Sequence, residues 1–171
     1  DVTYLWLKKT GTPNDTIYLE LRTTSGGAPT STVIARSKAI PCIGITTSFL
    51  RYRFEWPYPY YLDSATTYAL VVRADFAVSA SHYVSIASDA SAPGYAGGQQ
   101  YRYDGAAWNA VAADLCFALS SATEELVGYG TANQDADLVV DNTKFASQGF
   151  KGPVSYTGRV QALLYVKRTG T

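Results

Sequence analysis

The sequence is poor in the residues on which metal binding and catalysis most often depend. It contains no methionine, one histidine (His82) and two cysteines, Cys42 and Cys116, with no Cys-x-x-Cys pair. Structural zinc needs grouped cysteine and histidine ligands, and a catalytic triad needs a histidine held by a third group. Neither arrangement surrounds His82, which stands in the strand-like run "SHYVSIAS". We therefore expect His82 to be a surface or strand residue and the chain not to be an enzyme.

Charge is also scarce, and it is balanced. Only 16% of the residues are charged, with 14 basic and 14 acidic side chains. This balance leaves no basic footprint for nucleic acid or for an anionic membrane surface. No apolar run approaches the roughly 20 residues that span a bilayer, and the sequence shows neither an initiator methionine nor a signal peptide. We expect a mature form or a segment of a longer chain, with no nucleic-acid partner and no membrane span.

Residues typical of strands and turns are abundant instead. The chain has 14 tyrosines and 14 glycines; tyrosine suits pleated strands, and glycine suits turns. Apolar and polar residues alternate in many segments, which is the pattern of a half-buried strand. The inward residues expected in two of them are Ile17, Leu19 and Leu21 in "TIYLELR" (16–22), and Leu50, Tyr52, Phe54 and Trp56 in "SFLRYRFEW" (48–56). Further strands are expected at 2–9, 32–38, 66–74, 81–87, 99–104, 113–120, 137–141, 144–150 and 158–168.

Short segments rich in Gly, Pro, Asn, Asp and Ser separate these strands, and no segment has the pattern of a long helix. Asp104-Gly105 between two strands is a hairpin signal, because glycine accepts a positive φ without steric cost. "SATEELVG" (121–128) is short enough for a turn or a linker. The regular spacing of short strands predicts an all-β fold, a two-sheet antiparallel β-sandwich of jelly-roll type. Residues 1–121 would form its main body, and residues 122–171 a linker and C-terminal strands that complete this sandwich or a neighbouring unit.

The order of several segments resembles a known kind of module. They are "TIYLELRTTSGGAPTSTVIARS", "RYRFEWPYPYYLDSATTYALVV", "HYVSIASDASAPGYAGGQQYRYDGAAW" and "ADLCFALSS". Together they resemble the jelly-roll repeats, carbohydrate-binding-like or of "choice-of-anchor" type, of bacterial, archaeal and phage surface and tail proteins. The resemblance covers residues 2–121 and carries no catalytic signature. In those repeats a segment similar to "FASQGF" (145–150) opens the module, so the resemblance implies that this chain is permuted relative to them.

The two ends of the chain carry almost the same sequence. Residues 5–12, "LWLKKTGT", match residues 164–171, "LYVKRTGT", at a constant offset of 159 and with only conservative differences. Three explanations stay open: a tandem array of units of this length, a subunit whose terminal segment completes a neighbour's sheet, and internal pseudo-symmetry within one domain. All three are structural explanations, and none of them needs an active site.

Aromatic residues are the main candidates for ligand binding. "EWPYPYYL" (55–62) alternates prolines with aromatic rings, and stiffly held rings can stack on sugars or contact a partner. Tyr95, Tyr101, Tyr103 and Trp108 could form a second such surface. Packing against the sandwich core is the alternative for all these rings. The candidate glycan or partner contacts are Trp56, Tyr58, Tyr60, Tyr61 and Trp108.

Three smaller features suggest a metal site, a disulfide and a glycan attachment site. Asn133, Asp135 and Asp137 in "NQDAD" could offer oxygen ligands to a structural calcium ion, or could be ordinary turn residues; no other cofactor is expected. Cys42 and Cys116 could form a disulfide in an oxidising compartment, or could remain small buried thiols. Asn14 begins a glycosylation sequon in an expected loop.

These observations favour a mechanical role over a chemical one. We expect a non-enzymatic structural module of an extracellular filament, a sheath, a repeat-built surface protein or a phage tail fibre, located outside the cell, on its surface or in a virion. Its partners would be copies of itself or adjacent repeats, joined by pairing between strands. The alternative is a carbohydrate-binding module that uses aromatic residues 56–61 to bind glycans.

Overall fold

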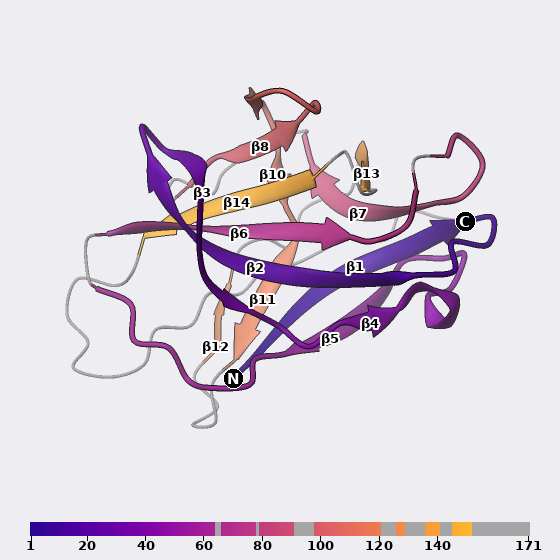
Figure 1. Ribbon diagram of the computed structural model, residues 1–171, viewed down its shortest axis with the longest axis horizontal. Coiled ribbons are helices and arrows are strands. Elements are labelled where there is room, and N and C mark those ends of the chain that lie inside the picture. The colour runs from indigo at the N-terminus through magenta and orange to yellow at the C-terminus, as the bar shows by residue number, and fades with distance from the viewer. Residues whose placement is uncertain are drawn as a thin grey trace.

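Two antiparallel β-sheets make up the described part of the molecule (Figure 1). The computed structural model describes residues 1–63, 66–77, 79–90 and 98–120, together with the backbone of residues 126–128, 136–140 and 145–151. None of these residues belongs to an α-helix, so no described helix is long and apolar enough to cross a membrane. The predicted all-β fold class, a two-sheet antiparallel β-sandwich, is confirmed.

Within the described residues each sheet has seven strands, and the chain crosses repeatedly between the sheets. Sheet A contains β1 (Val2–Thr10), β5 (Leu50–Glu55), β7 (Tyr83–Asp89), β10 (Asp114–Leu115), β11 (Phe117–Ser120), β12 (Leu126–Gly128) and β13 (Ala136–Val140). Sheet B contains β2 (Thr16–Ser25), β3 (Ala28–Arg36), β4 (Ile40–Pro41), β6 (Thr67–Ala74), β8 (Gln100–Tyr103), β9 (Trp108–Val111) and β14 (Phe145–Lys151). A short 3-10 turn, η1 (Cys42–Gly44), follows β4.

The core lies between the sheets and is built from the apolar residues that alternate along the strands. Ile17, Leu19 and Leu21 of β2 are all buried, as their spacing predicts. They belong to one cluster with Phe54 of β5 and Phe117 of β11, which are 0% and 1% exposed. Burying one such side chain contributes about 1.5–3 kcal/mol. The buried apolar side chains that the two sheets turn toward each other therefore hold the sheets together.

Strand β5 departs from the alternation expected for it. Leu50 is 52% exposed, so it is not buried as an inward residue would be, although its ladder partner Leu7 is 0% exposed. Among the described strands β5 pairs with β1 alone, so it lies at an edge of sheet A. Leu50 is also its first residue. An edge strand that is just beginning has fewer neighbours to cover its side chains, and Leu50 therefore reaches solvent.

The hairpin predicted at Asp104-Gly105 is confirmed by the pairing of β8 with β9. Gly105 has φ of 104°, in the region that favours glycine. Asp104 Oδ1 accepts the backbone N–H groups of Ala106 and Ala107, each at 2.9 Å. These two hydrogen bonds stabilise the ionised carboxylate, and they lower the pKa of Asp104.

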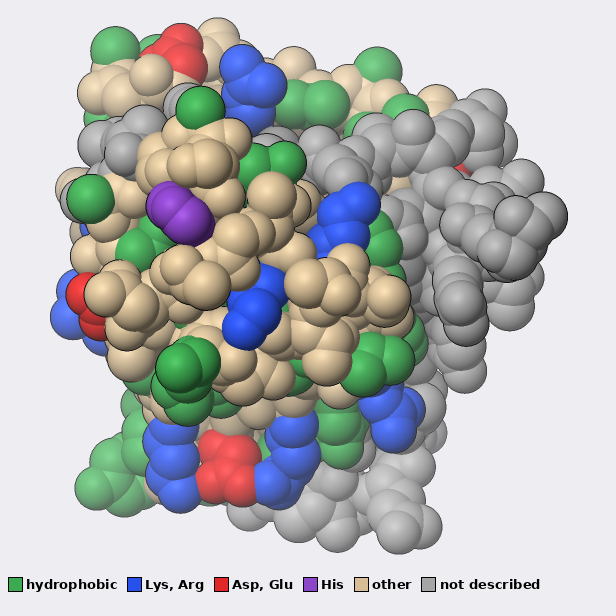
Figure 2. All heavy atoms as spheres, turned by 90° about the vertical axis from the view of Figure 1, so that its right-hand side faces the viewer, with side chains coloured by type: hydrophobic (Ala, Val, Ile, Leu, Met, Phe, Trp, Pro, Cys, Tyr) green, Lys and Arg blue, Asp and Glu red, His purple; other side chains and the backbone are tan. Residues whose placement is uncertain are grey.

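A tight turn ends β1, and the backbone requires glycine there. Gly11 has φ of 65°, a conformation that costs energy for residues with a Cβ. A Cβ at Gly11 would also overlap with the Ser81 carbonyl oxygen and with His82 Nδ1. His82 Nδ1 accepts the backbone N–H of Thr12 at 2.9 Å. The single histidine is thus a surface residue, visible in Figure 2, that holds this turn against the segment before β7.

We predict that Gly11→Ala destabilises the protein more than Gly26→Ala does. Gly26 has a similar φ of 58°, but no atom beyond its chain neighbours lies within 4 Å of the place that an added Cβ would take. Gly26→Ala should therefore cost only the backbone strain, about 1–2 kcal/mol, whereas Gly11→Ala adds steric conflict worth about 1–3 kcal/mol more. Thermal unfolding of both variants measures the difference. Equal losses of stability would contradict the close contact with His82.

Candidate assembly site and ligand surfaces

Strand β14 lies in the interior of sheet B, although it comes from the last described residues of the chain (Figure 1). It pairs along one edge with β6, over residues 146–151, and along the other edge with β8, over residues 145–148. In the described ladders β8 pairs with β14 and β9, so the β8–β9 hairpin joins sheet B through β14. We call the position between β6 and β8 the strand slot.

The end of the strand slot lies beside a connection that leads to sheet A. Lys151, the last residue of β14, is the partner of Thr67 at the start of β6. Val2, at the start of β1, is the partner of Glu55 at the end of β5. Because residues 56–66 link β5 to β6, they run from the start of β1 to the end of β14.

Strand β1 is the central strand of sheet A, and both of its edges are occupied. Along one edge it pairs with β5 over residues 2–7. Along the other edge it pairs with β11 over residues 2–5 and with β7 over residues 7–10. In the described ladders, residues 2–5 and Leu7 of β1 are therefore paired along both edges.

The C-terminal repeat of the β1 sequence retains the residues that this position requires. Leu5 and Leu7 are 0% exposed, and the residues at the same places in the repeat are Leu164 and Val166. The glycine of the tight turn, Gly11, is also repeated as a glycine. Thr3, which accepts a hydrogen bond from an indole N–H, is replaced by alanine in the repeat.

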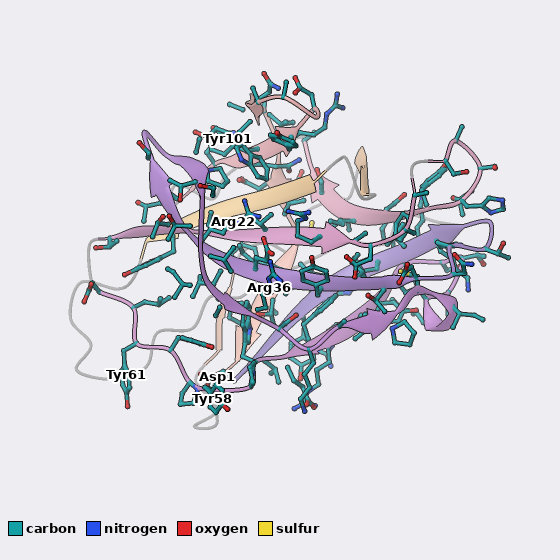
Figure 3. All side chains as sticks on the ribbon, in the orientation of Figure 1. Asp1, Arg22, Arg36, Tyr58, Tyr61 and Tyr101 are labelled. Atoms are coloured by element: carbon teal, nitrogen blue, oxygen red, sulfur yellow. The ribbon has the colours of Figure 1, made fainter. Side chains whose placement is uncertain are left out.

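The outer face of sheet B buries an ion cluster that the strand pattern does not reveal. Alternation along β2 predicts that Glu20 and Arg22 face away from the core, yet Glu20 is 0% and Arg22 is 8% exposed. Arg22 Nε donates to Glu20 Oε2 at 2.8 Å, and Arg22 Nη1 donates to the Thr30 carbonyl oxygen at 3.1 Å. Arg36 Nε of β3 lies 2.8 Å from Glu20 Oε1. Arg22 and Glu20 form a buried pair within β2, whereas the Arg36 side chain is 63% exposed, so solvent screens its pair with Glu20. The contacts that link β3 to β2 are the Arg22–Thr30 hydrogen bond and the Arg36–Glu20 pair (Figure 3).

The turn between β2 and β3 reaches across this outer face to β8. Gly27 has φ of 86°, and a Cβ there would lie 3.1 Å from the Tyr101 hydroxyl. Val71 of β6 is 0% exposed on the same face, and Tyr103 and Trp108 pack against it. Their rings lie 5.2 Å apart between centroids. Trp108 is thus partly buried by packing, and its predicted ligand contact stays a prediction; Tyr95 lies outside the described residues.

The aromatic segment 55–62 divides into packed and exposed rings. Trp56 Nε1 donates to Thr3 Oγ1 at 2.8 Å, and the Tyr60 ring meets Trp56 edge-on, with centroids 6.4 Å apart. Both rings pack against the core. Tyr58 and Tyr61 are 69% and 78% exposed, and Figure 3 shows Tyr61 pointing away from the sandwich. Within this segment, Tyr58 and Tyr61 are the rings that a ligand can reach.

Cys42 and Cys116 are both buried, and no disulfide joins them in the structure; the predicted disulfide stays a prediction. Both belong to the main core cluster, where a thiol behaves as a small apolar side chain. Burial, reinforced by the nearby charge of Asp15, raises the pKa of Cys42 from 9.0 to about 12. The folded state therefore holds this proton more tightly than the unfolded chain. The resulting stabilisation is complete below pH 9 and is lost as the pH rises towards 12.

We predict that a thiol reagent at pH 8 finds no reactive cysteine in the native protein and two in guanidinium chloride without reductant. Burial blocks access in the native state, and the thiolate of Cys42 is disfavoured there. Colorimetric thiol titration measures the number of reactive cysteines in the native and in the denatured protein. Two unreactive cysteines in denaturant, becoming reactive after reduction, would show a disulfide instead.

The remaining candidates are the predicted calcium ligands and the predicted glycosylation site, and the structure describes only some of these residues. Asn133 and Asp135 lie outside the described residues, whereas the backbone of Asp137 lies in β13, opposite Ala87 of β7. Among the described residues, no group of three or more His, Cys, Asp or Glu side chains is placed to hold a metal ion. Calcium binding therefore stays a prediction. Asn14 is exposed in the turn between β1 and β2, so a glycan attached there would meet solvent.

Comparison with known proteins gives no relative: no family model matches the chain, and neither the curated proteins nor the solved structures that were compared contain a match. The resemblance to jelly-roll repeats of surface and tail proteins therefore rests on the sequence pattern and stays a prediction. Function has to be inferred from the geometry of the chain itself.

Proposed function

We propose that this chain is a non-enzymatic structural module, a building unit of an extracellular filament, a sheath, a repeat-built surface protein or a phage tail fibre. Neighbouring units are joined by pairing between strands. The observation that carries the proposal is the position of β14, a late segment of the chain that occupies an interior place in sheet B. A sandwich whose sheet depends on such a segment can receive it from its own chain or from a neighbour.

Three further features support an assembled rather than a catalytic role. The chain repeats its β1 sequence at residues 164–171, although the β1 position holds one strand. Strands β3 and β9 stand at the two ends of the sheet B order, where unpaired backbone groups can join another sheet. The low charged fraction, 16%, also reduces repulsion between copies.

Assembly is testable on the purified chain. We expect sedimentation velocity to show larger species as the concentration rises, and electron microscopy to show regular polymers, because strand pairing between copies depends on concentration. A chain that stays monomeric at every concentration, also after unfolding and refolding at high concentration, would contradict the proposal.

A carbohydrate-binding module is the second candidate, and the exposure of Tyr58 and Tyr61 favours it. Exposed rings on a proline-stiffened segment are suited to stacking on sugar faces. We predict that Tyr58→Ala and Tyr61→Ala abolish binding on a glycan array without changing the melting temperature. Trp56→Ala is the matched control, since it removes a packed ring and should lower the melting temperature. Glycan binding that survives both tyrosine substitutions would remove this candidate.

A further inference from the structure

We propose that the outer edge of β5 binds an extended segment with acidic residues at alternate positions, which adds to sheet A as a further antiparallel strand. The inference rests on the proposed structural function, since it names one edge through which units join and the chemistry of the segment that this edge accepts. Three observations carry it: the backbone groups that β5 turns to solvent, the charges beside them, and an apolar side chain left uncovered at the same edge.

The first observation is that every second residue of β5 turns its backbone groups away from β1. Trp56, directly after β5, donates its backbone N–H to the carbonyl oxygen of its opposite residue, Asp1, at 3.0 Å. In an antiparallel ladder hydrogen-bonded and non-hydrogen-bonded positions alternate. In the register of this ladder residues 50, 52 and 54 therefore bond to β1, and residues 51, 53 and 55 face outward.

The outward direction of these groups is visible at Glu55. Its carbonyl oxygen accepts the backbone N–H of Lys38, which lies outside the ladder, at 2.7 Å. Among the described strands β5 pairs with β1 alone, and no described residue outside β5 bonds to the outward backbone groups of Arg51 and Arg53. Their N–H and C=O groups can therefore form four hydrogen bonds with an added strand, in a short ladder that ends where Lys38 begins.

The second observation is that basic side chains surround these backbone groups. Arg51, Arg53 and Lys38 carry three positive charges and Glu55 carries one negative charge, in a chain whose net charge is zero. The side chains of Lys38 and Arg53 are 65% and 54% exposed. Arg51 is also exposed, and its Cζ lies 4.6 Å from the centroid of the Tyr4 ring on the outer face of the sheet. Opposite charges on directly facing residues stabilise a strand pair, so an acidic residue opposite each arginine is favoured.

The same charges disfavour pairing between the β5 strands of two copies. Antiparallel pairing about a two-fold axis would place Arg51 and Arg53 of one copy opposite the arginines of the other. Like charges directly opposite each other are destabilising, and charged residues on edge strands commonly prevent association of this kind. The occupant is therefore a segment of the opposite charge and not a second β5.

The third observation is that the apolar face of sheet A stays uncovered at this edge. Leu50 is 52% exposed, although its partner Leu7 in β1 is buried. In an added strand, the residues that alternate with the acidic ones would lie on this face, beside Leu50 and Tyr52. Apolar residues at these places would remove the Leu50 side chain from water, which is favourable. The segment that fits the edge therefore alternates apolar and acidic residues.

The probe is the acetylated and amidated peptide Thr-Val-Glu-Val-Glu-Val-Thr, whose glutamates would lie opposite Arg53 and Arg51. Amide hydrogen exchange of the isotope-labelled protein is followed by NMR with and without the peptide. We expect the peptide to slow exchange of the Arg51 and Arg53 amides. The Tyr52 and Phe54 amides, which bond to β1, should be protected without it. Unchanged exchange at residues 51 and 53 with saturating peptide, or new protection only at β3 or β9, would overturn the proposal.

Two methylated peptides separate strand pairing from attraction between charges. In the antiparallel arrangement the backbone N–H groups of the two glutamates point at β5, whereas those of the three valines point away. N-methylation of the glutamates should therefore abolish the protection, and N-methylation of the valines should leave it. Equal protection by both methylated peptides would overturn strand addition, and the reverse order would overturn the antiparallel arrangement.

A charge reversal on the protein tests the preference for acidic residues. We expect Arg51→Glu to weaken binding of the peptide about tenfold and to strengthen binding of a peptide with lysines in place of the glutamates. Arg102→Glu is the matched control, because Arg102 of β8 is exposed and the change of net charge is the same. Equal effects of the two substitutions would overturn recognition by β5. If Arg51→Glu does not fold, Arg51→Gln replaces it, with a smaller loss expected.

Sedimentation of the same samples distinguishes this proposal from the proposed structural function. Larger species at high concentration, without peptide protection of β5, would leave the structural function standing and overturn the part played by this edge. Protection of β5 in a chain that stays monomeric at every concentration would support the edge and overturn the assembly of copies. Monomers without protection would overturn both.

Discussion

The pairing of β14 with β6 on one side and β8 on the other is the interaction on which sheet B depends. Strands β3, β2 and β6 form one part of the sheet, and the β8–β9 hairpin forms the other, with β14 between them. The turn between β2 and β3 reaches over the same face to Tyr101, and the cluster around Glu20 links β3 to β2. These contacts cover a sheet that is continuous because residues 145–151 complete it.

The same dependence relates the fold to assembly. A sheet that needs a late segment of the chain is indifferent to which copy supplies that segment, provided that the register is the same. The sequence of residues 5–12, in β1 and the turn after it, is repeated at residues 164–171, which lie outside the described residues.

Alternation along the chain predicted the strands and much of the core, because burial on one face of a strand imposes a period of two residues. It predicted the burial of Ile17, Leu19 and Leu21 but not the exposure of Leu50, since alternation says which residues share a face but not how well that face is covered. Glu20 was assigned correctly to the outer face. Its burial could not be predicted, because it depends on a hairpin folding across the sheet. The position of β14 was likewise hidden, since its partners lie far away in sequence.

Hydrogen–deuterium exchange of the native chain tests most directly whether residues 145–151 complete sheet B. An amide that is hydrogen-bonded in an interior strand exchanges only when that region opens. The structure predicts that the paired amides of β14 are protected to an extent similar to those of β6, its neighbour in the sheet. Exchange of β14 at the rate of an unpaired peptide, while β6 stays protected, would contradict the account.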